Sequence, residues 1–135
     1  MLLVRMSVLP VHVRGLRGIG LYQQPPGRHP TPHRQAPGNE KIELVTGGRG
    51  WIEQDGRWIE VRAGDIAWQA VGDLTIARSD FTDPYRCLAI SVAVDPTSTR
   101  PVSRLTHWGD AAEVRGFVRA SLRREPYKYT AGTGL

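Results

Sequence analysis

Side chains that bind metals or polar ligands are concentrated in one early stretch of the chain. His29, His33, Glu40 and Glu43 supply imidazole and carboxylate groups there. A transition-metal site needs about three or four such ligands converging on one point. The alternative is that His29 and His33 are solvated side chains of a loop, because the surrounding segment 25–39 is rich in proline and shows no apolar periodicity.

The same region offers polar contacts for a small molecule. Tyr22, His33 and Arg34 lie close together in sequence, and a guanidinium group recognises a carboxylate or a pair of hydroxyls through its planar fork. Glu43 lies in an expected strand, where it either points inward or forms an outward salt bridge. For Arg34 the alternative is an ordinary surface side chain.

Three tryptophans follow, namely Trp51, Trp58 and Trp68, and their rings are able to stack on a sugar or an aromatic ligand. Core packing is the competing interpretation for each of them. Cys87 begins a short apolar run, which is typical of a small buried residue, and no base for a nucleophilic role is evident. As the single cysteine, it allows no internal disulfide, which fits a reducing, cytoplasmic setting.

These residues must be positioned by short strands separated by glycine and aspartate turns. Asp55-Gly56 between two alternating runs indicates a tight hairpin, because a type I′ turn needs positive φ at both central residues. Strands are expected at 19–23, 41–46, 51–54, 57–62, 66–69, 74–78 and 86–94. Many short strands at such spacing predict an antiparallel β-barrel or sandwich over about residues 17–94.

In the last forty residues the spacing of apolar side chains changes from that of a strand to that of a helix. Asp110 and Glu113 form a capping pair for a helix, and Pro126 would stop that helix. The expected helix carries an apolar stripe at helical spacing, which makes it amphipathic. The stripe consists of Val114, Phe117, Val118 and Leu122. We therefore expect a barrel with an N-terminal arm in residues 1–95, then a linker and this helix in residues 96–135.

The chain has 135 residues, the size of one domain, and a net charge of +5 that comes mainly from arginine. A basic balance favours acidic partners, but the arginines are scattered and match no nucleic-acid-binding motif, so a solvated basic surface is the simpler interpretation. The apolar stretch in residues 1–10 is too short to cross a membrane and lacks a signal-peptide cleavage site.

The segment 43–88 resembles the sensor domain of AraC-type bacterial transcription regulators, a cupin-type barrel. The resemblance rests on ELVTGGRGWIEQDGRWIEVRAGDI, with its strand, glycine turn, hairpin and Gly-Asp turn, and on GDLTIARSDFTDPYRCLAI. The tail VSRLTHWGDAAEVRGFVRASLRRE resembles the segment with which those regulators begin their linker and dimer helix. The implied fold is a mainly β, double-stranded β-barrel (jelly roll) followed by an amphipathic helix.

Two departures from the family pattern affect function. Family members carry a C-terminal region with two helix-turn-helix units, for which these 135 residues leave no room, so the sequence is either a truncated sensor domain or a free-standing relative. Metal-binding cupins place two histidines and a glutamate early and one histidine late. Here Thr75 falls about where the late histidine belongs. We therefore expect no bound metal and no other cofactor.

The resemblance implies a module that senses a small polar metabolite, such as a sugar, in the barrel mouth. The expected ligand-binding residues are Tyr22, His33, Arg34, Glu43, Trp51 and Trp68. The stripe on the C-terminal helix would form a homodimer contact, and DNA would be bound only through a separate region. The alternative is a small stand-alone cupin enzyme, a metal-dependent dioxygenase or sugar isomerase, but we expect no catalytic residues.

Overall fold

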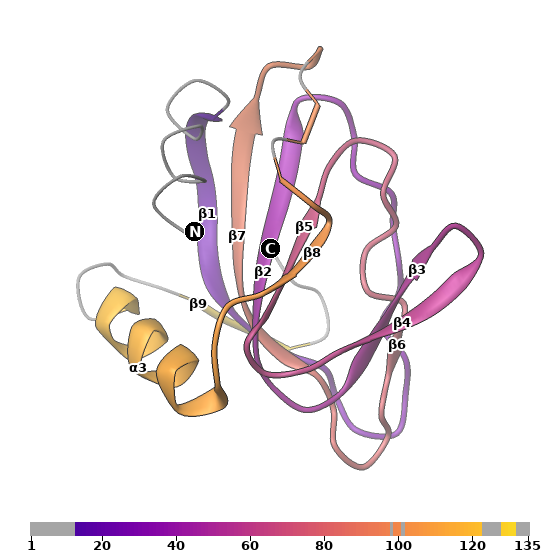
Figure 1. Ribbon diagram of the computed structural model, residues 1–135, viewed down its shortest axis with the longest axis vertical. Helices are drawn as coiled ribbons and strands as arrows, with labels where there is room; N and C mark the ends of the chain where they lie inside the picture. Colours follow the sequence, from indigo (N-terminus) through magenta and orange to yellow (C-terminus); the bar gives the residue numbers. More distant parts are fainter. Residues whose placement is uncertain (1–12, 98, 101, 123–127, 132–135) are drawn as a thin grey trace.

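The computed structural model describes residues 13–97, 99–100, 102–122 and 128–131, which form two β-sheets and a helix (Figure 1). The larger sheet has the strand order β8-β5-β2-β7-β1-β9, and the smaller has the order β4-β3-β6. The elements are β1 (Val13–Gln23), β2 (Asn39–Gly47), β3 (Gly50–Gln54), β4 (Arg57–Val61), β5 (Asp65–Gln69), β6 (Arg78–Ser79), β7 (Arg86–Val94), β8 (Leu105–His107), α3 (Ala111–Leu122) and β9 (Lys128–Ala131). The described chain is therefore mainly β, as predicted.

The hairpin between β3 and β4 follows directly from its turn residues. Asp55 and Gly56 have φ values of 53° and 76°, which is the left-handed region required at both positions of a type I′ turn. Gln54 pairs with Arg57 and Ile52 with Ile59, so the register is regular on both sides of the turn. The predicted hairpin is confirmed, and it projects away from the helix (Figure 1).

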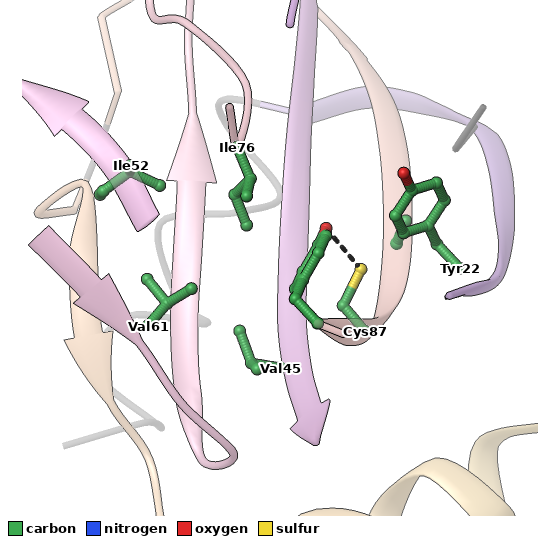
Figure 2. Packing of buried hydrophobic residues seen from close by; sticks show 8 residues of the cluster. Tyr22, Val45, Ile52, Val61, Ile76 and Cys87 are labelled. Carbon is green, nitrogen blue, oxygen red and sulfur yellow. Dashed lines mark hydrogen bonds between the residues drawn. The ribbon is translucent and has the colours of Figure 1, made fainter. Parts of the chain in front are cut away.

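The main core lies between the two sheets. Val45 from the larger sheet and Ile52 and Val61 from the smaller one are completely buried and converge there (Figure 2). Burial of each such side chain stabilises the fold by about 1.5–3 kcal/mol. The side chains Tyr22, Ile76, Tyr85, Cys87 and Ala89 complete this cluster. It is the inside of the barrel.

A second cluster covers the outer face of the larger sheet. Leu44 on β2 and Leu88 on β7 lie opposite one another in register, and both are buried together with Val118 of α3. The helix thus packs on the face opposite the barrel interior. This explains why β7 is apolar along most of its length: alternate residues point to opposite faces, and both faces are buried.

The helix begins where the capping pair predicts. The backbone N–H of Glu113 donates to Asp110 Oδ1 at 2.9 Å, the bond expected of an N-cap residue. Val118 is 7% exposed and packs within its own chain. The side chains of Val114, Phe117 and Leu122 lie outside the described part of the structure, as do Pro126 and the N-terminal arm in residues 1–12. The predicted stripe and its dimer contact stay predictions.

Two details of the sheets differ from the prediction. The expected strand 74–78 is irregular, with Leu74 in an isolated bridge to Arg34 and only Arg78–Ser79 paired as β6, because Asp73 and Thr75 form hydrogen bonds to the β1–β2 loop instead. The larger sheet also gains β8, paired with β5, and β9, which runs parallel to β1. Both strands fall in the segment that the sequence analysis assigned to the linker and helix.

Candidate functional site

A small cavity lies inside the barrel, surrounded mainly by polar side chains. Its volume is about 30 Å³. That is room for about two water molecules at most. The lining consists of Tyr22, Pro30, Thr31, His33, Lys41, Glu43, Thr75, Ile76, Tyr85, Cys87 and Ala89. A polar lining inside an otherwise apolar core is the feature that sets this region apart from ordinary packing.

Strands β2 and β7 supply the base of the cavity. Alternation along β2 turns Lys41, Glu43 and Val45 to one face, and the antiparallel register brings Ala89 opposite Glu43 and Cys87 opposite Val45. All of these residues lie inside the barrel, whereas Leu44 between them faces the helix.

Tyr85 links two buried polar groups from these strands. Its hydroxyl donates to Glu43 Oε2 at 2.6 Å and lies 3.1 Å from Cys87 Sγ. Because the phenol proton goes to Glu43, the thiol is left to donate to the Tyr85 oxygen. Burial raises the pKa of Glu43, and it raises the pKa of Tyr85 and of Cys87 well above their ordinary values. Cys87 is therefore a protonated, buried thiol and is unsuited to nucleophilic chemistry.

Tyr22 on β1 extends the network on one side. Its ring centroid lies 5.5 Å from that of Tyr85, and its hydroxyl donates to the side-chain oxygen of Gln24. Gln24 Nε2 in turn donates to the carbonyl of Arg28 at 3.1 Å, which ties the barrel wall to the β1–β2 loop. Burial, with smaller contributions from Cys87 and Glu43, raises the pKa of Tyr22 to about 12. Tyr22 is thus a neutral hydroxyl at the cavity wall.

Lys41 and Gln69 face each other across β2 and β5 beside Glu43. Gln69 is completely buried, and neither its amide oxygen nor its amide nitrogen has a hydrogen-bond partner among the described residues. Gln69 lies close enough to Glu43 to lower the pKa of the Glu43 carboxyl, and this opposes the larger effect of burial. The two side chains do not have the geometry of a hydrogen bond. A buried polar group without partners costs about 1–3 kcal/mol. A polar molecule that reached Gln69 would recover part of that cost.

The β1–β2 loop covers the mouth of the cavity. His33 N–H donates to Thr75 Oγ1 and Thr75 N–H donates to the His33 carbonyl, both at 2.9 Å. Gln35 N–H donates to the Asp73 carbonyl at 3.0 Å. Burial, with Lys41 nearby, lowers the pKa of His33, so this imidazole is neutral at pH 7. Because the loop is fastened across the mouth, a ligand larger than water has to displace it.

The structure brings three of the six expected ligand-binding residues together. Tyr22, His33 and Glu43 line the cavity. Arg34 is exposed and donates to the Gly72 carbonyl at 3.0 Å. The other two are tryptophans that lie elsewhere. Trp51 is on the outer face of the smaller sheet under the Arg49 guanidinium, and Trp68 is buried on the helix side of the larger sheet, where its indole N–H donates to Glu40 Oε1 at 2.6 Å.

The early histidines and glutamates that suggested a metal site are separated. His29 Nδ1 accepts a bond from the Ser79 N–H, Glu40 faces Trp68, and only His33 and Glu43 reach the cavity. Within the described ranges, no three His, Cys, Asp or Glu side chains are grouped closely enough to hold a metal ion. Thr75, the residue expected where metal-binding cupins have their late histidine, does line the cavity. These residues do not fit a transition metal.

Sequence reasoning missed several cavity residues, above all Tyr85, Cys87 and Lys41. The sequence assigns no role to Tyr85 and predicts that Cys87 is a small buried residue. Alternation along β2 places Lys41 on the same face as Glu43, so this one signal was present in the sequence. For Tyr85 and Cys87 the pairing partner of β7 was needed, and no local pattern supplies it.

No protein-family model matches this sequence, and a search of curated proteins gives no match. Among solved structures, the chain is similar to one described as a predicted oxalate decarboxylase from Thermotoga maritima, with 22% identity over 59% of this chain and 69% of that chain and a TM-score of 0.50. It is also similar to a cupin protein from Bacteroides fragilis, with 25% identity over 63% of this chain and 70% of that one and a TM-score of 0.43.

The two-sheet topology and the similarity to the Thermotoga maritima structure show a cupin-type fold. At 22% identity this similarity establishes the fold and says nothing about ligand or activity. Separately, none of the helices in the described residues is long and apolar enough to span a membrane.

Proposed function

We propose that this chain is the small-molecule-sensing domain of an AraC-type transcription regulator and that it binds a small polar metabolite inside the barrel. The observation that carries the proposal is the buried polar lining around Glu43 and Tyr85, together with the buried Gln69 amide opposite Lys41, which has no hydrogen-bond partner among the described residues. Buried polar groups of this kind are suited to orienting a ligand through hydrogen bonds.

The ligand is expected to carry both hydroxyl donors and acceptors, as a sugar does. Glu43 and the Gln69 carbonyl oxygen accept, whereas Lys41 and the Gln69 amide nitrogen donate. With about 30 Å³ of free space, the present form admits only water-sized groups. Binding therefore selects a form in which the β1–β2 loop has moved from the mouth. Such a difference between two forms is what lets a ligand act as a signal.

In this proposal the chain regulates transcription without binding DNA itself. The conformational change on ligand binding would be transmitted to a DNA-binding region through α3. This helix packs on the outer face of the larger sheet, against Leu44 and Leu88. We propose that a second copy of the chain binds through the same helix, and that any DNA contact belongs to a separate region.

Thermal unfolding in the presence of a panel of monosaccharides and small polyols tests the proposal. A ligand that binds only the folded state raises the melting temperature in a saturable way. The site variant is Glu43→Gln, and Glu113→Gln on the exposed start of α3 is the matched control. We expect at least one compound to stabilise the parent and the control but not the site variant. Equal stabilisation of both variants, or of neither protein by any compound, would contradict the proposal.

A further inference from the structure

A second groove lies outside the barrel, and three arginines from distant parts of the chain border it. Arg34 comes from the β1–β2 loop, whereas Arg100 and Arg104 precede β8. The rest of the lining comes from the β3–β4 hairpin and the turn after β5, namely Glu53, Gln54, Asp55, Gly72, Asp73 and Leu74. The groove has a volume of about 370 Å³ and shares no lining residue with the interior cavity.

Arg104 forms the buried wall of this groove. The residue is 6% exposed, and its two terminal nitrogens donate to the carbonyls of Glu53 and Leu74, each at 2.5 Å. Its Nε has no hydrogen-bond partner among the described residues. A buried guanidinium N–H without an acceptor is costly, so an acceptor supplied by a ligand would be favourable.

The carboxylate nearest to these arginines is already shared. Asp73 accepts from the Ala70 N–H and from Arg100, and it lies 4.0 Å from Arg104 Nε. Arg34 bonds to a carbonyl, not to a carboxylate. Two of the three guanidinium groups therefore contact one engaged carboxylate, and the third, that of Arg34, borders the same groove.

Two further carboxylates border the hairpin side. Glu53 Oε1 accepts from the Gly56 N–H at 3.0 Å, and Asp55 lies exposed at the tip of the turn. Both belong to the β3–β4 hairpin, whereas the arginines lie on the loop side. An anion would therefore sit between Arg34 and Arg104, away from the tip.

We propose that this groove binds the phosphate group of a small phosphorylated compound. Guanidinium forks form bidentate, charge-assisted bonds to phosphate, and a tetrahedral group presents enough oxygens for more than one arginine. The groove is larger than a phosphate ion, which leaves room for an organic part. This site is separate from the sensing site of the proposed function and does not depend on it.

Isothermal titration calorimetry with inorganic phosphate and with glucose 6-phosphate, at ionic strength held constant with chloride, tests the inference. Glucose serves as the uncharged reference. We expect saturable binding of at least one phosphorylated probe to the parent protein. Arg34→Gln should weaken that binding by about tenfold or more. Arg17→Gln, an exposed arginine on β1 far from the groove lining, should leave it unchanged. Tighter binding of the ester would identify a phosphomonoester as the ligand, and tighter binding of the ion would identify free phosphate.

Two results would overturn the inference. One is the absence of saturable phosphate binding, or equal weakening by Arg17→Gln and Arg34→Gln, which would mean diffuse charge only. The other is loss of binding in Glu43→Gln with binding kept in Arg34→Gln, which would place the anion inside the barrel. Arg104→Lys, confirmed as folded by circular dichroism, is the second variant and should also lose affinity. Failure of the sugar panel leaves these results unaffected, because the two sites have no residue in common.

Discussion

The hydroxyl of Tyr85 donates to Glu43 Oε2 at 2.6 Å, which joins two residues 42 positions apart inside the barrel. The carboxyl is fully enclosed, and burial raises its pKa despite this bond and the nearby Lys41. Because the pKa of the Glu43 carboxyl differs between the folded and unfolded states, its protonation affects the stability of the protein, which can be measured.

Glu43 should make the stability of the protein depend on pH. The folded pKa lies above the unfolded value, so the stability linked to this proton is present below the unfolded pKa and is lost as pH rises through the folded pKa. Glu43→Gln cannot ionise. As pH rises above the ordinary glutamate pKa of about 4.3, the variant should therefore lose less of its free energy of unfolding than the parent, measured by urea denaturation. Parallel pH profiles of parent and variant would disprove this.

Tyr22 should ionise only in strongly alkaline solution while the protein is folded. Its pKa is raised to about 12, chiefly by burial. The difference in absorbance at about 295 nm between the parent and Tyr22→Phe should appear near pH 12 in the native state and near pH 10 in denaturant. A native difference already complete near pH 10 would mean that the ring is accessible to water.

Cys87 should not react with a thiol reagent until the protein unfolds. The side chain is 1% exposed, and burial and the neighbouring Glu43 raise its pKa well above the ordinary value. Because the thiolate is the reactive form, labelling by a disulfide reagent at about pH 8 should be slow in buffer and fast in guanidinium chloride. This is the single cysteine of the chain, so the signal has one source. Rapid labelling in buffer would contradict the buried network.

Two glycine substitutions should change stability in opposite directions. Gly56 has a φ of 76° in the hairpin turn, whereas Gly116 lies in α3, and an added Cβ meets no atom within 4 Å at either position. Gly56→Ala should destabilise by about 1–2 kcal/mol through backbone strain. Gly116→Ala should stabilise by about 0.5–1 kcal/mol through helix propensity. Guanidinium denaturation measures both, and a loss of stability in Gly116→Ala would mean that the helix ends earlier.

The dimer prediction concerns the helix stripe. Val118 already packs against Leu44 and Leu88 of its own chain, so a second copy would have to use other residues of the stripe. The double variant Phe117→Asp with Leu122→Asp should reduce a dimeric parent to a monomer in light scattering, because buried carboxylates oppose association. A soluble variant with the mass of the parent would show that the helix is not the association surface.

The local features of this fold were readable from the sequence, because short-range physics determines them. Asp55-Gly56 fixed the hairpin through positive φ, alternation placed β2, β3, β4 and β7, and Asp110 marked the start of the helix. Alternation likewise put Glu43 on a definite face of β2. It did not say whether that face was the inside of the barrel.

The tertiary structure alone decided which residues meet. Tyr85 and Cys87 reach Glu43 only because β7 pairs with β2 across a long separation in sequence, and Trp68 faces Glu40 on the other side of the same sheet. Arg34 and Arg104 meet at the groove because both contact Leu74, which is far from each of them in sequence. A strand pattern gives two faces of different polarity, but sheet pairing and the position of α3 determine which face encloses a cavity. Those long-range contacts leave no signature in the local sequence.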